Sequence, residues 1–383
     1  MSKLLLKFVI FLEESGPLLT TNKGPLFHRW LPDGQHDSIM LDTKDPDSGL
    51  EIWFERRGVT EDNFIRFDYK RREVNPNILK NQGFLDAGPL MGLLTIENLP
   101  EVKLAPIREN RIGDVNYIAL GKKIVKKLLY PPISRFIGLL RVNYGQYWIR
   151  QLEKWDSRKA TLGAYCKQIK LEWSLDGGNT WTPFVPDEPV LQLSLTISAG
   201  PAYLEYLTKE DWHKMEEILQ TEYEPSPAAF IIARSHQLLD QGDTRNALID
   251  GVTALELATE EFMRRKRQNS TDLGKALGPF WRQSPKPRTQ MVSLAVALGV
   301  APIEDIELAI EAIETRNDLV HEGIDPPENA EKQATCLLNI AAAFLSGPPF
   351  RFPTARIGNT HMTSEQWEKA YKKKARGRSQ SVS

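Results

Sequence analysis

Short apolar runs separated by turn residues characterise the first half of the chain. The runs are rich in aliphatic, β-branched and aromatic side chains, which favour β-strands. Clusters such as Pro32-Asp33-Gly34 lie between them and favour turns. Strands are therefore predicted at residues 4–12, 51–56, 63–68, 93–98, 168–173 and 191–197. Together they predict a β-rich domain over residues 1–205.

A helical insert is predicted within this domain. Residues 115–155 are apolar and basic in turn, without the turn clusters that separate the strands. Proline disrupts a helix interior because it lacks a backbone N–H and its ring clashes with the preceding turn. The pair Pro131-Pro132 is therefore expected to split this segment into two helices.

The pattern changes near residue 200, where apolar residues begin to recur every three or four positions. This spacing is typical of helices with one buried face. Ser226 can cap a helix that starts at Pro227, and Asp243 or Thr244 can cap the next one. Helices are predicted at residues 202–221, 227–241, 245–268, 271–277, 288–298, 302–320 and 329–345.

The fold class is therefore predicted to be α+β. A β-rich N-terminal domain with a helical insert, residues 1–205, is followed by an all-α helical bundle over residues 206–347. A basic tail follows at residues 348–383. Two of the predicted bundle helices carry regular apolar stripes: Leu248, Val252, Leu255, Thr259 and Phe262 in one, and Ala334, Leu337, Ala341 and Phe344 in the other.

The helix predicted over residues 302–320 ends in a group of polar side chains, which are Arg316, Asn317, Asp318 and His321. Its apolar stripe consists of Ile303, Ile306, Ile310 and Ile313. Continued at helical spacing, the stripe reaches Asn317 and then Val320. An amide buried without a partner costs about 1–3 kcal/mol. Either Asn317 has a partner, or this turn opens onto a cleft.

The sequence Arg316-Asn317-x-x-x-His321 resembles the Arg-x4-His motif of the HEPN superfamily. The step Ala254-Leu255-Glu256 is similar to one found in Apea-like HEPN proteins. The resemblance covers about residues 225–346 and includes the position of the motif at the end of a penultimate long helix. It implies a helical bundle that is either a metal-independent RNA endonuclease or a module that only binds or dimerises.

The motif residues suit RNA cleavage without a metal, because the 2′-OH of RNA can itself attack the adjacent phosphate. His321 is the candidate general acid or base, since an imidazole ordinarily titrates near about 6.5. Arg316 offers a planar set of donors for phosphate oxygens. Asn317 and Asp318 are candidates for orienting the imidazole or the RNA. No cofactor is expected, and no metal-ligand spacing is found.

The spacing of the motif sets a geometric condition. Five residues on an ideal helix place Arg316 and His321 about 140° apart. They can act side by side only if the helix ends between them, which Gly323 and Pro326-Pro327 favour. HEPN nucleases usually build one cleft from two copies of the motif, so the resemblance implies a homodimer. A purely structural interpretation is also open, with the arginine facing the helix dipole and the histidine as a cap.

Composition excludes a global electrostatic basis for RNA binding. The 383 residues carry a net charge of −1, with 41% hydrophobic and 26% charged residues. Any electrostatic contact with RNA must therefore come from a local group of basic residues. The basic candidates are Arg264, Arg265 and Lys266 at a helix end, and Lys372, Lys373 and Lys374 in the tail. For the tail, a solvated segment without a partner is the alternative.

The cysteines and the first predicted strand indicate the cellular compartment in which the protein is expected. Cys166 and Cys336 lie far apart and match no disulfide framework, which suits a reducing cytoplasm. Lys7 interrupts the first apolar run, so this run is interpreted as a strand and not as a signal peptide. No run approaches the length of a membrane span, so no membrane partner is expected.

Residues 174–181, Ser-Leu-Asp-Gly-Gly-Asn-Thr-Trp, match the Asp-box found in sialidases and other β-proteins. Asp176 can accept hydrogen bonds from turn amides, and Gly177 and Gly178 suit positive φ. A glycosidase would need repeated boxes, and this chain has one. The motif therefore predicts a structural hairpin in which Trp181 packs back on the strand.

Three functions remain open from the sequence. The first is a metal-independent RNA endonuclease, which the resemblance places in bacterial defence or toxin action, with the N-terminal domain sensing a protein or phage trigger. The second is a non-catalytic dimerisation or RNA-binding module with an N-terminal recognition domain. The third is a carbohydrate- or protein-binding β-domain to which the helices are structural.

Overall fold

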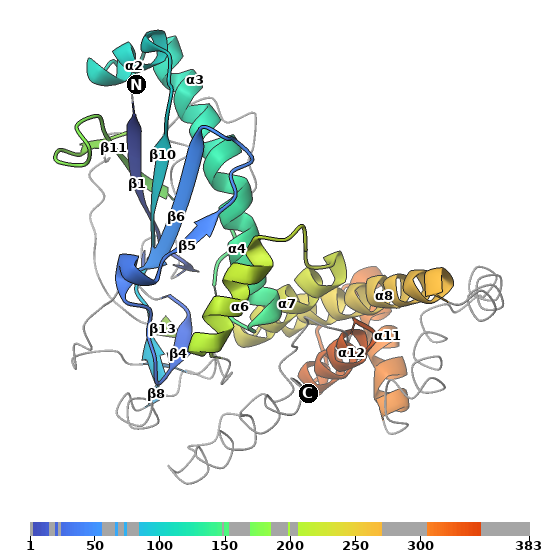
Figure 1. Cartoon of the computed structure of the whole chain (residues 1–383). Helices are drawn as coiled ribbons and strands as arrows, with labels where there is room; N and C mark the ends of the chain where they lie inside the picture. Colours follow the sequence, from blue (N-terminus) through green and yellow to red (C-terminus); the bar gives the residue numbers. More distant parts are fainter. Residues whose placement is uncertain are drawn as a thin grey trace.

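The computed structural model has a mixed α+β fold, with an antiparallel sheet in the N-terminal part and helices in the C-terminal half. Figure 1 shows a long helix running beside the sheet towards the helical group. The predicted strand 191–197, the predicted helices 271–277 and 288–298, and the tail lie outside the described residues. The structure describes residues 3–14, 20–21, 24–55, 66–67, 73–74, 84–147, 149–152, 169–184, 198–199, 206–269 and 305–345.

The main sheet has the strand order β12-β11-β1-β10-β6-β5, and every neighbouring pair is antiparallel. In the register of the sheet, Leu6 lies opposite both Leu94 and Trp173. The predicted strands at 4–12, 51–56, 93–98 and 168–173 are confirmed, with bounds that differ by a few residues. The strands are β1 (Leu4–Ile10), β5 (Ile39–Leu41), β6 (Ser48–Phe54), β10 (Leu90–Ile96), β11 (Ile169–Ser174) and β12 (Thr182–Pro183).

Shorter elements surround this sheet. They are β2 (Glu13–Glu14), β3 (Thr20–Thr21), β4 (Leu26–His28), η1 (Gly34–Asp37), β7 (Arg66–Phe67), β8 (Glu73–Val74), β9 (Phe84–Asp86) and β13 (Ser198–Ala199). Strand β7 falls within the predicted strand 63–68. Along β10 every second side chain is buried, which is the pattern of a strand with one face on a core.

The Asp-box forms the predicted hairpin between β11 and β12, where Trp173 pairs with Thr182. The Asp176 carboxylate accepts hydrogen bonds from the Thr180 hydroxyl at 2.5 Å and from the backbone N–H groups of Asn179 and Thr180 at 3.0 Å. Gly177 and Gly178 have φ of +76° and +94°. The Lys7 Nζ of β1 lies 4.8 Å from the centre of the Trp181 ring, which returns towards the sheet as predicted.

The buried face of the sheet packs against a helical segment of three parts: α3 (Val115–Lys123), the π-helical turn η2 (Ile124–Leu129) and α4 (Tyr130–Asn143). The short helix α2 (Glu101–Arg108) precedes it. The prediction that Pro131-Pro132 split this segment is wrong, because the chain stays helical from Val115 to Asn143. Pro131 is the second residue of α4 and follows directly after the wider π-helical turn of η2.

Helix α6 (Lys209–Leu219) completes the core of the sheet. Its Trp212 is 2% exposed and lies 5.6 Å from Phe54 and 6.2 Å from Phe136, measured between ring centroids. The Trp212 indole N–H also donates to the carbonyl of Asp37 at 3.1 Å. The connecting helix expected within residues 202–221 is therefore present and packs with the N-terminal part of the chain.

A second core lies among four helices, α7 (Pro227–Asp240), α8 (Thr244–Asn269), α11 (Asp305–His321) and α12 (Ala330–Leu345). The predicted caps are confirmed at Ser226, whose hydroxyl accepts from Ala229 N at 3.2 Å, and at Asp243, which accepts from Asn246 N at 3.1 Å. The predicted stripe of α12 is buried, and so is that of α8 except for Phe262, which is partly buried and packs against the same core. At Gly251, α8 faces α12, and a Cβ built there would make an ordinary contact of 3.5 Å with Leu337 Cβ.

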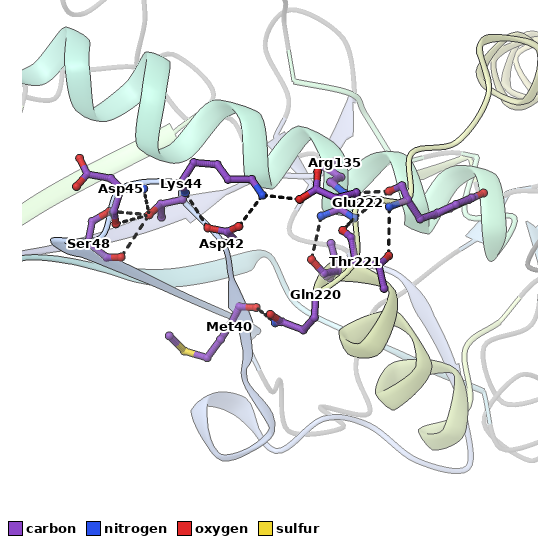
Figure 2. A network of polar contacts seen from close by, with 12 residues as sticks. Met40, Asp42, Lys44, Asp45, Ser48, Arg135, Gln220, Thr221 and Glu222 are labelled. Carbon is purple, nitrogen blue, oxygen red and sulfur yellow. Dashed lines mark hydrogen bonds and ion pairs between the residues drawn. The ribbon is translucent and has the colours of Figure 1, made fainter.

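A polar network joins the first part of the chain to the helices (Figure 2). Arg135 of α4 donates hydrogen bonds to four backbone carbonyls, two at the end of α6 and two in the connection from α6 to α7. These belong to Ile218, Leu219, Thr221 and Tyr223. From the β5–β6 turn, Lys44 Nζ lies 3.0 Å from a Glu222 carboxylate oxygen. The Gln220 amide donates to the carbonyl of Met40 at 3.0 Å.

Candidate functional site

The polar group at the end of α11 is the candidate site. Helix α11 continues through His321, and Glu322 N still donates to Asp318 O at 2.9 Å. Gly323 follows with φ of +69°, the left-handed conformation that commonly ends a helix. The expectation that the helix ends between Arg316 and His321 is therefore wrong. Gly323 stops the helix only after the histidine.

The described part of the predicted isoleucine stripe of α11 is on the core side, since Ile313 is buried and Ile310 packs against the helical core. Ala309, Ala312 and Leu319 are fully buried, whereas Val320 is 45% exposed. The prediction of Val320 as a continuation of the buried face is wrong. The buried face of α11 thus combines two small alanines with Ile313 and Leu319. The side chains of Ile303 and Ile306 lie outside the described residues.

Arg316 lies on this buried face. At 100° per residue it falls between Ala309 and Ala312 and next to Leu319. Its side chain is half-buried, and its Nη1 donates to Asn317 Oδ1 at 3.2 Å. The Arg316 Nε is buried without a hydrogen-bond partner among the described residues. The amide of Asn317 therefore has the partner that its position required.

His321 and Asp318 are exposed. Because α11 is continuous, His321 is turned about 140° from Arg316 around the helix axis. Within one chain, the structure brings Arg316 and Asn317 together and leaves His321 on a different side. Two of the exposed large apolar side chains flank this histidine, Val320 at 45% and Ile324 at 42%.

Arg245, which sequence reasoning missed, contacts the same turn. It lies in the first turn of α8, and its Nη2 donates to Leu319 O at 2.6 Å. Its Nη1 donates to Ile324 O at 3.2 Å. A weak signal was present in the sequence, because an arginine in the first turn of a helix opposes the dipole of that helix. Such a residue suggests a partner elsewhere, but the partner itself cannot be read from the pattern.

The candidate RNA-binding residues are placed differently from one another. Arg264 is exposed, whereas Arg265 is half-buried and donates from Nη2 to Phe344 O at 2.8 Å, at the end of α12. The side chain of Lys266 and the whole of Lys372, Lys373 and Lys374 lie outside the described residues. Of the basic end of α8, Arg264 is thus the described side chain directed to solvent.

The described residues contain neither a metal-binding cluster nor a membrane-spanning helix. In this part of the chain, no group of three or more histidine, cysteine, aspartate or glutamate residues could hold a metal ion. Among the same residues, no helix has the length and apolarity needed to cross a membrane.

Comparisons with known proteins add no assignment. No protein-family model, curated protein or solved structure matches this chain.

Proposed function

We propose that this protein is a metal-independent RNA endonuclease whose site is built from two copies of α11. The observation that carries the proposal is the position of the motif residues around one helix. Arg316 and His321 have complementary chemistry but lie about 140° apart, so one chain does not unite them. A second copy would supply what the first lacks, Arg316 acting with the partner's His321. The exposed Val320 and Ile324 beside His321 offer apolar surface for such a contact.

The reaction follows from the chemistry of RNA. The 2′-oxygen attacks phosphorus, the bond to the 5′-oxygen breaks, and a 2′,3′-cyclic phosphate and a 5′-hydroxyl result. His321 takes the proton from the 2′-OH or gives one to the leaving oxygen. Arg316 stabilises the negative charge that builds up on the phosphate oxygens. Asn317, bonded to Arg316, holds the guanidinium in place.

The first experiment is cleavage of a mixed-sequence RNA in EDTA by the wild type, Arg316→Ala and His321→Ala. Cleavage by the wild type alone, with cyclic phosphate ends, is the expected result. Equal cleavage by wild type and His321→Ala would exclude His321 from the chemistry. The solution mass, measured in parallel, is expected to be that of a dimer.

Mixing the two inactive variants tests whether the site is shared. In a heterodimer of Arg316→Ala and His321→Ala, one of the two sites regains both residues. Random exchange makes half of the dimers heterodimers, so about a quarter of the wild-type activity should return. A mixture as inactive as its components, with heterodimers present by mass, would show that the two residues do not act across a dimer.

A non-catalytic dimerisation or RNA-binding module is the second candidate. One observation favours it: Arg316 is directed into the bundle and bonded to Asn317, as a structural arginine would be. This version expects a dimer that binds RNA without cleaving it. The resemblance to HEPN proteins supports both candidates. For the nuclease it suggests bacterial defence or toxin action, with the N-terminal part responding to a protein or phage trigger.

A further inference from the structure

Arg245 links two backbone carbonyls on either side of His321. Its guanidinium leaves the first turn of α8 and reaches Leu319 O at 2.6 Å and Ile324 O at 3.2 Å. Leu319 precedes the histidine and Ile324 follows Gly323, so the two bonds span the whole end of α11. One side chain on a neighbouring helix thus closes the turn that carries His321.

The charge of Arg245 is explained by α11 and not by its own helix. A cation at the start of a helix opposes the positive end of the dipole, at a cost of about 0.3–1 kcal/mol. The last carbonyls of α11 form a negative helix end without partners inside that helix. The guanidinium of Arg245 satisfies one of these carbonyls, that of Leu319, together with the carbonyl of Ile324 beyond the helix, and hydrogen bonds from a charged donor are the stronger kind.

The backbone that carries Arg245 is itself held in place. Asp243 caps α8 by accepting from Asn246 N at 3.1 Å and from the Asn246 side-chain amide at 2.7 Å. Gly242, with φ of +79°, makes the tight turn from α7 into this cap. At the other end, the Leu319 side chain is fully buried in the helical core. The turn around His321 is thus held between two rigid points.

We propose that Arg245 is the positioning residue of His321. The proposal rests on the proposed nuclease function. Arg245 acts through the backbone of residues 319–324 and has no assigned contact with RNA. Its bridge fixes the direction in which the imidazole leaves the end of α11. Lysine carries the same charge but presents a single ammonium, which cannot reproduce the planar two-point bridge.

The test compares Arg245→Lys with Arg234→Lys, a matched exchange on α7 where Arg234 pairs with Asp250 at 3.3 Å, away from the motif. Arg245→Lys is expected to lower kcat about tenfold with KM little changed, because RNA binding is kept and the orientation of the imidazole is lost. Arg234→Lys is expected to keep the wild-type kcat. Rates are compared per folded molecule, with thermal unfolding measured for each variant.

A second readout needs no RNA. The imidazole C–H signals of His321 in NMR spectra, and hydrogen exchange of the amides of residues 319–324, are expected to change in Arg245→Lys and not in Arg234→Lys. Unchanged signals and exchange in Arg245→Lys would overturn the positioning role. If the wild type does not cleave RNA, the nuclease proposal fails, and these spectra alone decide whether Arg245 positions His321.

Discussion

Asp176 stabilises the β11–β12 hairpin through hydrogen bonds that require its ionised form. The hydroxyl of Thr180 is the main cause that lowers the pKa of this carboxyl below its usual range, with the Thr180 and Asn179 N–H groups and the Ser174 hydroxyl adding to it. A lowered pKa in the folded state stabilises the fold above the unfolded pKa, about 4. That contribution is lost as the pH falls towards the folded pKa.

Asp176→Asn is therefore expected to lower the midpoint of thermal unfolding at pH 7. The amide cannot accept the same set of hydrogen bonds with a full charge. The difference from the wild type should shrink as the pH is lowered below about 4, since the wild-type carboxyl is then increasingly protonated when unfolded. Glu217→Gln, an exposed exchange on α6, is the control. A difference that stays constant from pH 7 to pH 3 would contradict the linkage.

At the scale of the strand, Gly92 lets β10 lie close to its neighbours. A Cβ there would lie 2.7 Å from the Glu51 carbonyl oxygen and would overlap the ring of Phe8, which is fully buried. Gly49, on the adjacent strand β6, has only Met40 Cε nearby, 3.9 Å from a built Cβ. The same sheet thus holds one glycine required by packing and one that is not.

Gly92→Ala is expected to reduce the free energy of unfolding by about 1–3 kcal/mol, because Phe8 or the backbone must move. Gly49→Ala is expected to be neutral or slightly stabilising, since alanine loses less chain entropy on folding. Urea unfolding of the two variants measures both values. Equal destabilisation would mean that the close approach to Phe8 does not constrain the strand.

An element can be predicted from the sequence when residues close to it in the chain determine it. The helix starts at Ser226 and Asp243 were predictable because a cap depends on its own side chain and the next three residues. The continuous helix from α3 through Pro131 into α4 was not predictable, because the π-helical turn before Pro131 has no recognisable pattern in the sequence. Val320 was misplaced because the neighbouring helices, and not the apolar spacing alone, decide which face of α11 is buried.

The candidate site, too, could be predicted only as far as neighbouring residues in the sequence determine it. The type and spacing of Arg316 and His321 identify them as candidates, and their roles in an RNase stay predictions. Their directions depend on where α11 ends and on what covers it, which required the structure. Arg245 lies 76 positions before His321 by residue number and contacts the same turn. The sequence around Arg245 therefore does not identify the carbonyls that it contacts.

At the scale of the whole molecule, α4 is the helix that contacts both the sheet and the C-terminal helices. Its first half lies in the core of the sheet, and its end contacts α7, where Arg141 is 3% exposed. Arg141 donates to the carbonyls of Tyr147 and Ile149 and to the side chain of Gln237, the latter at 3.0 Å. Burial lowers its pKa to about 10, so it stays charged at neutral pH. Helix α4 thus contacts both the core of the sheet and the helices that follow it.

Arg135 is the point at which this link can be tested. Its guanidinium donates to two carbonyls at the end of α6 and two in the α6–α7 connection, and methionine in its place would leave these acceptors without their charged donor. Arg135→Met is expected to lower the free energy of unfolding by about 3 kcal/mol. It should also speed hydrogen exchange and proteolysis at residues 218–226.

Lys44→Met is the matched control, because it removes a charged contact to the same connection. Lys44 and Glu222 are 67% and 92% exposed, and ion pairs in solvent contribute little. The variant should therefore unfold like the wild type. If both variants unfold alike, Arg135 does not hold the connection. If Arg135→Met also lowers RNA cleavage while the bundle remains folded, the connection carries a signal from the sheet to α11.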